Sequence, residues 1–370
     1  MEDIGMRMCK RKSTICGILA IVLLATACSQ RIDEGEEDEK LQETQDWSKQ
    51  DDLKYEQTLS EEITADGTEE EFSHEMVENE ETDELQKQNE DREATAEISE
   101  QIPEKYLVHR EDEAGDVISI SYITHDYLGE GQEITKNANI YLPYGYDENK
   151  EYNVLYLMHG IGGDENEWKM RDEDSEAKNI IDNLIYYGDI QPFIIVMPNG
   201  RSSSRNLPGD SDIASFDKFG EELRNDLIPY IEENFSTYAV SGEELSKARE
   251  HRAIAGLSMG GMQTINIGIG ECIDLFGYFG AFSAASGSNT AEQTAELLKN
   301  NSYEIYFFYN ICGTSDLTAY DSAAAAVKDL PELCGQFESG RNFMWQEVDG
   351  EHDFLVWYLG LYNFAQLVFK

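Results

Sequence analysis

The most informative segment of this chain reads His251-Arg-Ala-Ile-Ala-Gly-Leu-Ser-Met-Gly-Gly-Met262. Ala253 to Leu257 are small and apolar, which predicts a strand buried on both faces of a parallel sheet. Gly256-Leu-Ser-Met-Gly260 then fits Gly-x-Ser-x-Gly, the pattern of a tight strand-to-helix turn that lifts a serine hydroxyl above the sheet. The glycines are needed because a Cβ two residues before Ser258 does not fit so tight a turn, and because the following helix must start close against the strand. A packed glycine turn without chemistry remains the alternative, so other residues must support a role for Ser258.

Strand-like and helix-like segments alternate on both sides of this turn. The predicted apolar strands are Val154–Met158, Phe193–Met197, Ala253–Leu257, Gly277–Ala281, Glu304–Ile311 and Met344–Val348. The predicted helices are Ser175–Tyr187, Phe219–Asn234, Gln263–Gly270, Ser322–Leu333 and Phe354–Phe369. Earlier, Val117–Thr124 and Asn137–Pro143 alternate apolar and polar residues, as antiparallel edge strands do. These repeated units predict one α/β domain over residues 103–370, with a doubly wound, mostly parallel sheet and helices on both faces.

The N-terminus is typical of a secretory signal over residues 1–27. Four basic residues between Arg7 and Lys12 precede an apolar run, Ile15 to Ala25, that is too short to span a bilayer comfortably. The run ends in Leu24-Ala-Thr-Ala-Cys28, which resembles the bacterial lipobox, although Ala25 stands where leucine is usual. We therefore expect a lipid on Cys28 and a protein held at the extracellular face of a bacterial membrane. Simple cleavage after Ala27, giving a secreted protein, is the alternative.

Residues 28–102 are predicted to form a disordered acidic tether. Residues 31–100 hold 28 acidic and 6 basic residues with few large apolar ones, so they cannot bury enough surface to offset the entropy of ordering. The whole chain has a formal net charge of −47. Such a charge repels phosphate backbones and anionic lipids, so we expect no nucleic-acid partner.

A serine hydroxyl needs a neighbouring base before it can act as a nucleophile. In α/β-hydrolases the nucleophile, the acid and the histidine follow one another in that order along the chain. Only His352 of the six histidines follows Ser258, and it lies between the last predicted strand and the last predicted helix. Asp316 lies in the loop after the predicted strand Glu304–Ile311 and is the candidate acid, with Asp321 as its rival. A surface histidine and a helix-capping aspartate are the alternatives without chemistry.

Hydrolysis of an ester also needs donors for the oxyanion. The backbone N–H of Met259, directly after Ser258, is one candidate. The second is the N–H of Ile161 in the glycine-rich segment His159-Gly-Ile-Gly-Gly163, which follows a predicted strand. His159 itself is expected to be structural and bonded to nearby backbone.

Other candidates carry weaker signals. Trp168 is a candidate for lining a substrate cleft, although its apolar surroundings favour core packing. Arg201 and Arg205 follow a predicted strand on the same side as Ser258, so either can contact substrate or face solvent. Three cysteines, Cys272, Cys312 and Cys334, leave open one disulfide or three free thiols. No spacing of His, Cys and carboxylate residues indicates a metal site, and no cofactor is expected.

Four motifs in order resemble the esterase D-like family, and within it carbohydrate esterase family one, the feruloyl and acetylxylan esterases attached to bacterial xylanases. These motifs are His159-Gly-Ile-Gly-Gly-Asp-Glu-Asn-Glu-Trp168, the turn Gly256 to Gly261, Gly313-Thr-Ser-Asp316 and His352-Asp-Phe-x-x-Trp357. The resemblance covers roughly residues 115–370. The acidic N-terminal segment departs from those relatives, and the sequence shows no xylanase or carbohydrate-binding module.

The resemblance implies an α/β-hydrolase fold and an ester-bearing polysaccharide or oligosaccharide as substrate. It places the nucleophile, acid and base at Ser258, Asp316 and His352, and the oxyanion donors at Ile161 and Met259. A siderophore esterase, an acyltransferase and a cytosolic S-formylglutathione hydrolase share the fold. A surface lipoprotein that binds without catalysis is the alternative from a different class.

Overall fold

A computed structural model describes residues 97–204 and 212–370. The predicted signal segment 1–27, the predicted lipid site Cys28, most of the predicted tether 28–102 and Arg205 lie outside these residues. Within the two described ranges, no helix combines the length and the apolar character needed to cross a bilayer.

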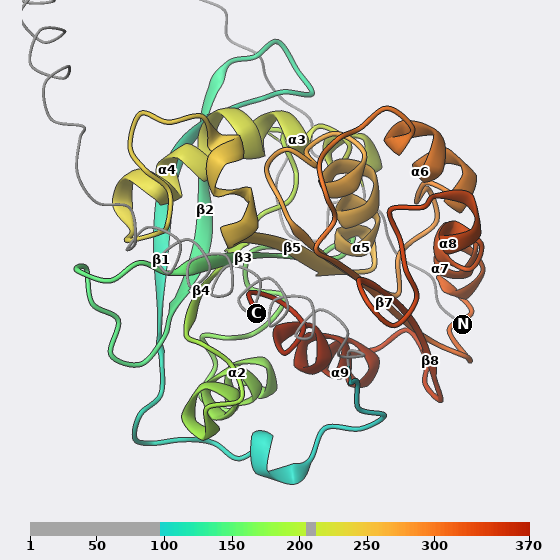
Figure 1. Ribbon diagram of the computed structural model, residues 1–370. Coiled ribbons are helices and arrows are strands. Elements are labelled where there is room, and N and C mark those ends of the chain that lie inside the picture. The colour runs from blue at the N-terminus through green and yellow to red at the C-terminus, as the bar shows by residue number, and fades with distance from the viewer. Residues whose placement is uncertain (1–96, 205–211) are drawn as a thin grey trace, which may run out of the picture. The chain divides into compact units, whose positions relative to one another are not determined.

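A single sheet of eight strands organises the part of the chain that the structure describes (Figure 1). The strand order is β1-β2-β4-β3-β5-β6-β7-β8. The strands are β1 Asp116–His125, β2 Glu133–Leu142, β3 Asn153–Met158, β4 Phe193–Pro198, β5 Arg252–Leu257, β6 Tyr278–Phe282, β7 Phe307–Gly313 and β8 Phe343–Val348. β2 is antiparallel to both β1 and β4, and the other neighbours run parallel. The doubly wound, mostly parallel sheet expected from the sequence is therefore confirmed.

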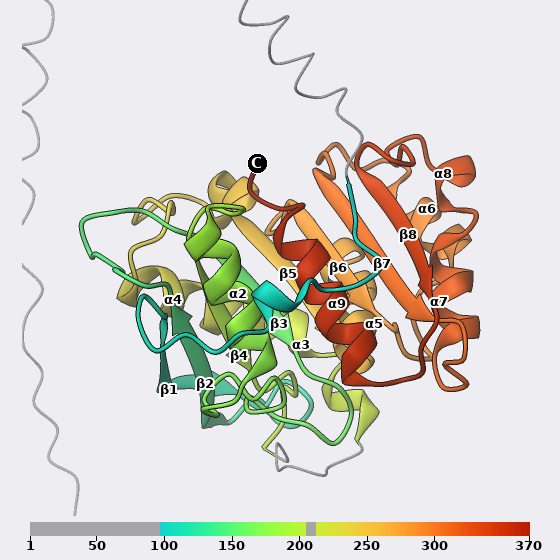
Figure 2. The same cartoon turned by 90° about the horizontal axis from the view of Figure 1, so that it is seen from below.

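Helices cover both faces of the sheet. One face carries α2 (Glu176–Tyr187) and α9 (Phe354–Ala365), which lie in front of the strands in Figure 2. The opposite face carries α3 (Phe219–Glu222), α4 (Ile228–Asn234), α5 (Met259–Gln263), α6 (Ala291–Leu298), α7 (Tyr320–Val327) and α8 (Leu330–Leu333). Because each face is covered, the central strands are buried at every position, as in β4 and β5.

Some helices differ from the expectation. The predicted helix Phe219–Asn234 is interrupted by a π-helical turn at Leu223–Leu227, which ends two residues before Pro229. Proline lacks an N–H for regular helical pairing. The predicted helix Ser322–Leu333 is divided into α7 and α8 ahead of Pro331. α6 is not among the helices predicted from the sequence, although Thr290 and Gln293 form a capping box at its start.

The folded domain includes residues before the expected boundary at residue 103. The N–H of Ser99 donates to Asn363 Oδ1 in α9, at 2.9 Å. The carbonyl of Ser99 accepts from Gln346 Nε2 of β8 and from Asn363 Nδ2, each at 2.9 Å. Ile98 and Ile102 pack against the core beneath α9. Residues 97–102 therefore pack with the folded domain.

Candidate active site

The candidate site lies where the parallel strands end at their carboxyl ends. The loops after β3, β4, β5, β7 and β8 all reach this edge of the sheet, where ligands bind in open α/β sheets. The three side chains predicted to act together come from three of these loops. Their meeting depends on the sheet and not on proximity in sequence.

Ser258 occupies a strained turn between β5 and α5. Its φ of 52° and ψ of −112° lie outside the regions that most residues with side chains adopt. A Cβ on Gly256 would come within 2.7 Å of both Met158 Cβ and the Gly260 carbonyl carbon. A Cβ on Gly260 would come within 2.8 Å of the carbonyl oxygens of Met158 and His159. Both glycines of the motif are therefore required by close contact of α5 with β3.

The structure brings Ser258, His352 and Asp316 together in one hydrogen-bonded line. His352 Nε2 lies 3.0 Å from Ser258 Oγ, and His352 Nδ1 lies 2.8 Å from Asp316 Oδ2. Trp357, in the first turns of α9, stands edge-on to the imidazole, with ring centroids 5.0 Å apart at 87°. The geometry leaves Nε2 free to accept the Ser258 proton only if Nδ1 carries the hydrogen that Asp316 accepts.

Asp316 is held as a carboxylate by its surroundings. Its Oδ1 accepts from the backbone N–H groups of Thr318 at 2.9 Å and Ala319 at 2.8 Å. Burial raises the pKa of Asp316, but the hydrogen bonds from His352 and from the Ala319 N–H outweigh burial and hold the pKa below its ordinary value. The rival acid Asp321 is exposed in the first turn of α7. The contact with His352 is thus made by Asp316.

The loop after β3 lies against the nucleophile. A Cβ on Gly160 would approach Ser258 Cβ to 3.3 Å and Leu257 Cδ1 to 2.8 Å, so only glycine lets the backbone pass so close. Ile161 follows in this loop, and Gly162 has a φ of 79°. Met259 is the first residue of α5, where the backbone N–H has no acceptor within the helix. Ile161 thus follows a residue in close contact with Ser258, and Met259 adjoins Ser258 in the chain; that their N–H groups bind an oxyanion stays a prediction.

His159 has the structural role expected from the sequence. It is buried, its Nδ1 lies 2.7 Å from the Gly160 carbonyl oxygen, and its Nε2 accepts from the N–H of Gly200 at 2.8 Å. Because Gly200 N–H can only donate, Nε2 is unprotonated and the ring is neutral. Burial lowers the pKa of His159 to about 4. The ring thereby joins the loop after β3 to the loop after β4.

This bond gives a pH-dependent prediction. The pKa of His159 is about 4 in the folded protein and about 6.5 when exposed, so its contribution to stability is complete above pH 6.5 and falls as the pH drops toward 4. The free energy of unfolding falls by about 3 kcal/mol as this contribution is lost. We expect a His159→Gln variant to lack this part of the pH dependence when unfolding in urea is followed between pH 4 and 7. The exposed His109, changed to Gln, is the control, and parallel curves for wild type and His159→Gln would contradict the prediction.

Two predicted substrate contacts occupy other positions. Trp168 is 1% exposed, donates through Nε1 to the Met158 carbonyl at 3.1 Å and packs against Phe282, so it is a core residue. Arg201 is fully buried, donates to the Gly163 carbonyl at 2.7 Å and lies over the ring of Phe216. Neither side chain faces the solvent from which a substrate arrives. Arg201 instead holds the glycine-rich loop through its hydrogen bond to the Gly163 carbonyl.

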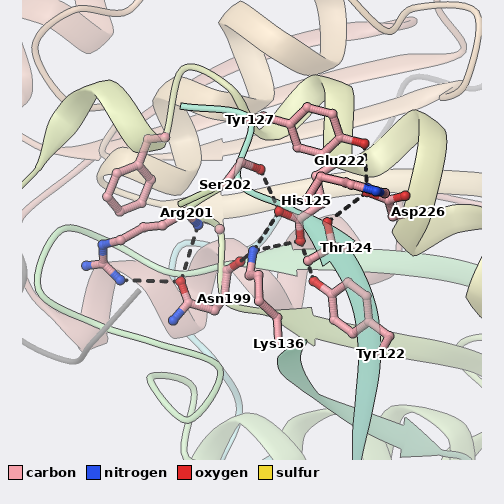
Figure 3. A network of polar contacts seen from close by, with 12 residues as sticks. Tyr122, Thr124, His125, Tyr127, Lys136, Asn199, Arg201, Ser202, Glu222 and Asp226 are labelled. Carbon is pink, nitrogen blue, oxygen red and sulfur yellow. Dashed lines mark hydrogen bonds and ion pairs between the residues drawn. The ribbon is translucent and has the colours of Figure 1, made fainter. Parts of the chain in front are cut away.

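A buried ion pair, which sequence reasoning missed, supports the loop after β4 (Figure 3). Lys136 of β2 and Glu222 of α3 are fully buried, and Lys136 Nζ lies 2.6 and 2.8 Å from the two carboxylate oxygens of Glu222. Lys136 Nζ also donates to the Asn199 carbonyl at 2.8 Å, and Ser202 Oγ donates to Glu222 at 2.5 Å. The signal was the alternation in β2, which places Lys136 on the same buried face as Ala138.

Comparisons with known proteins show the family of this chain. A family model described as putative esterase matches residues 132–355, which is more than half of the chain. The chain is 35% identical over 233 residues to endo-1,4-beta-xylanase Y of Acetivibrio thermocellus. It is 33% identical over 248 residues to an endo-1,4-beta-xylanase/feruloyl esterase of Xylanibacter ruminicola. These matches cover 58% and 64% of this chain but only 20% and 29% of the two relatives.

Solved structures that are similar to this chain include feruloyl esterases. A mutant of the feruloyl esterase module from Clostridium thermocellum, complexed with sinapinate, aligns with a TM-score of 0.63 and 28% identity over 75% of this chain and 95% of that one. A ferulic acid esterase from the anaerobic fungus Anaeromyces mucronatus, in complex with ferulic acid, aligns with a TM-score of 0.60 and 28% identity. That alignment covers 74% of this chain and 98% of the fungal one.

Proposed function

The chain belongs to the esterase family and is a carboxylic ester hydrolase with the α/β-hydrolase fold, and on this basis we propose that it removes acyl groups from plant cell-wall polysaccharide. The observation that carries the proposal is the continuous hydrogen-bonded line from Ser258 Oγ through His352 to Asp316. The acyl group that we propose is feruloyl on xylan, with acetyl as the alternative.

The first half of the reaction forms an acyl enzyme. Ser258 Oγ attacks the ester carbonyl carbon while His352 Nε2 takes the hydroxyl proton. Negative charge develops on the carbonyl oxygen, where the N–H groups of Ile161 and Met259 stabilise it. His352 then passes the proton to the departing sugar oxygen, and the bond between the acyl carbon and that oxygen breaks.

The second half regenerates the enzyme. A water molecule loses a proton to His352 Nε2 and its oxygen attacks the acyl carbon. The bond to Ser258 Oγ breaks, the serine regains its proton from His352, and the free acid leaves. Asp316 remains ionised throughout, because its role is to fix the imidazole and to stabilise the positive charge that forms on it.

Two observations favour an aromatic acyl group. The similar structures include complexes with sinapinate and with ferulic acid, both of which are aromatic acids. Three apolar side chains are exposed on the segments that follow the strands at this end of the sheet: Ile161 at 46% after β3, Leu317 at 101% after β7 and Leu355 at 75% in the first turn of α9. Exposed apolar side chains gathered at a site supply the contact surface that a phenolic ring needs.

The cellular location is also a proposal. The basic and apolar residues before Cys28 support export and a lipid on that cysteine, which would hold the enzyme at the extracellular face of a bacterial membrane. An enzyme in this position meets polymers that are too large to enter the cell.

Substrate class is tested by supplying two esters side by side. We expect the protein to release ferulate from methyl ferulate and from feruloylated arabinoxylan, with less acetate released from acetylated xylan, because the exposed apolar side chains match the larger acyl group. Free acids are measured by chromatography, with a siderophore ester as a third substrate. Acetate release alone would replace feruloyl by acetyl, and hydrolysis of only the siderophore ester would overturn the proposed function.

A further inference from the structure

A second groove lies at the end of the sheet opposite Ser258. Two adjoining cavities of about 600 and 970 Å³ share Glu250, Tyr278 and Lys370 in their walls and so form one continuous depression. Glu250 lies two residues before β5, and Tyr278 is the first residue of β6. Ser258 follows the last residue of β5, and a strand of six residues is about 20 Å long. The groove is therefore separate from the candidate active site.

One half of the groove presents a tyrosine ring with a supported rear face. Tyr238 is 39% exposed, and its ring is stacked on His251 with centroids 4.0 Å apart and an interplanar angle of 16°. His251 is itself fixed, because its Nδ1 lies 2.8 Å from Asn153 Oδ1 at the start of β3. The ring of Tyr238 thus offers one flat face, and little entropy is lost when a ligand covers it.

The other half of the groove repeats this arrangement with a different support. Tyr303 is 37% exposed, and the Arg249 guanidinium carbon lies 5.3 Å from its ring centroid. Arg249 cannot swing away, because it donates to the carbonyl oxygens of Ile273, Phe276 and Glu304 at 2.7 to 3.1 Å. Two rings, each backed by a planar and hydrogen-bonded side chain, therefore belong to one groove.

We propose that this groove binds a neutral polysaccharide chain, such as the xylan that carries the substrate esters. The flat C–H faces of sugar rings pack on exposed aromatic rings, and sugar hydroxyls bond to amide side chains. Such amides line both halves of the groove, as Asn153 and Gln191 on one side and Asn301 on the other. Lysine and glutamate side chains occur together in its walls, and the protein as a whole is strongly acidic, which disfavours a polyanion.

The choice of ligand rests on the proposed function, whereas the groove itself does not. Binding at this end of the sheet would keep the enzyme on the polymer between hydrolytic events. The residues that do so belong to the catalytic domain and require no separate binding module. Small soluble esters have no polymer chain to bind in the groove. Changes in the groove should therefore weaken polymer binding and leave hydrolysis of methyl ferulate unchanged.

The test measures binding to arabinoxylan from which alkali has removed all acyl groups, so that the active site has no ester to hold. The full chain is run by affinity electrophoresis in gels with and without this polymer. We expect wild type to be retarded, and Tyr238→Ala and Tyr303→Ala each to weaken binding about tenfold. Their kcat/KM for methyl ferulate should stay unchanged. Tyr186→Ala is the matched control, because Tyr186 is 48% exposed on α2 and stacked against Arg110, away from the groove.

Each outcome has a defined meaning. Three results would contradict the proposal that the groove binds the polymer: the polymer does not retard wild type, it retards the Tyr238→Ala/Tyr303→Ala double variant as much as wild type, or Tyr186→Ala weakens binding as much as the groove variants do. Stronger retardation by heparin than by arabinoxylan would overturn the neutral ligand. If one variant does not fold, Tyr144→Ala replaces it, because that 56% exposed ring lines the same groove and supports neither stacked pair. Retardation by the polymer without release of either ferulate or acetate from the test esters would support the groove and contradict the proposed function.

Discussion

Replacing Ser258 with alanine is expected to lower kcat/KM for p-nitrophenyl butyrate by about 10⁴ or more. The variant removes the hydroxyl that lies 3.0 Å from His352 Nε2, so no acyl enzyme can form. The remaining rate should come from binding and from the backbone donors alone. Because alanine differs from serine by one oxygen, the midpoint of thermal unfolding should stay close to that of wild type.

A control separates the hydroxyl at this position from serine content in general. Ser315→Ala changes an exposed serine beside Asp316 and should leave the rate unchanged. A fluorophosphonate probe, which reacts with activated serines, should label wild type and Ser315→Ala but not Ser258→Ala. Hydrolysis or labelling that survives in Ser258→Ala would remove Ser258 as the nucleophile and with it the mechanism.

Replacing Asp316 with asparagine is expected to lower kcat by about 10⁴ while the binding of substrate changes little. The asparagine amide can donate a hydrogen to Nδ1 and so favours the tautomer in which Nε2 carries the proton. An imidazole in that tautomer cannot accept the proton of Ser258. The measurement is kcat and KM for methyl ferulate, made on both proteins at the same pH.

The pKa of Asp316 sets the pH range of this comparison. Because the folded-state pKa is below the ordinary value of about 3.9, the carboxylate stays ionised above that pH, and its contribution is lost only as the pH falls through the lower value. Ionisation of Asp316 itself therefore does not vary from about pH 5 upward, and the loss in Asp316→Asn above that pH is not caused by titration of this carboxylate. Asp321→Asn is the matched control and should retain full activity. A larger loss in Asp321→Asn than in Asp316→Asn would reverse the assignment of the acid.

The sequence predicted the parts of the molecule that depend on local pattern. Apolar runs such as Val154–Met158 can be placed as buried strands, because a strand covered on both faces tolerates few polar residues. The Gly-x-Ser-x-Gly turn fixes its own neighbourhood through the contacts of Gly256 and Gly260. His352 could be selected because it is the only histidine after Ser258.

Burial of polar side chains could not be predicted in the same way. An arginine after a strand is usually solvated, but Arg201 is buried, where the Gly163 carbonyl, from a different loop, accepts a hydrogen bond from it. Lys136 and Glu222 are 86 residues apart, and no local pattern links them. The groove depends on the ends of several strands meeting, so Tyr238 and Tyr303 give no signal in the sequence. The lipid on Cys28 remains a prediction.

The buried pair of Lys136 and Glu222 limits how the loop after β4 can evolve. Loss of either partner alone leaves the other charge buried, at a cost of about 3–5 kcal/mol. Replacing both with apolar residues leaves the hydroxyls of Tyr122 and Ser202 without an acceptor, because both donate to the carboxylate of Glu222. A lineage that exchanges this pair must change several residues at once. Gradual divergence of substrate range in this loop is therefore expected beyond Ser202, while Asn199 to Ser202 stay fixed in position by the network beneath them.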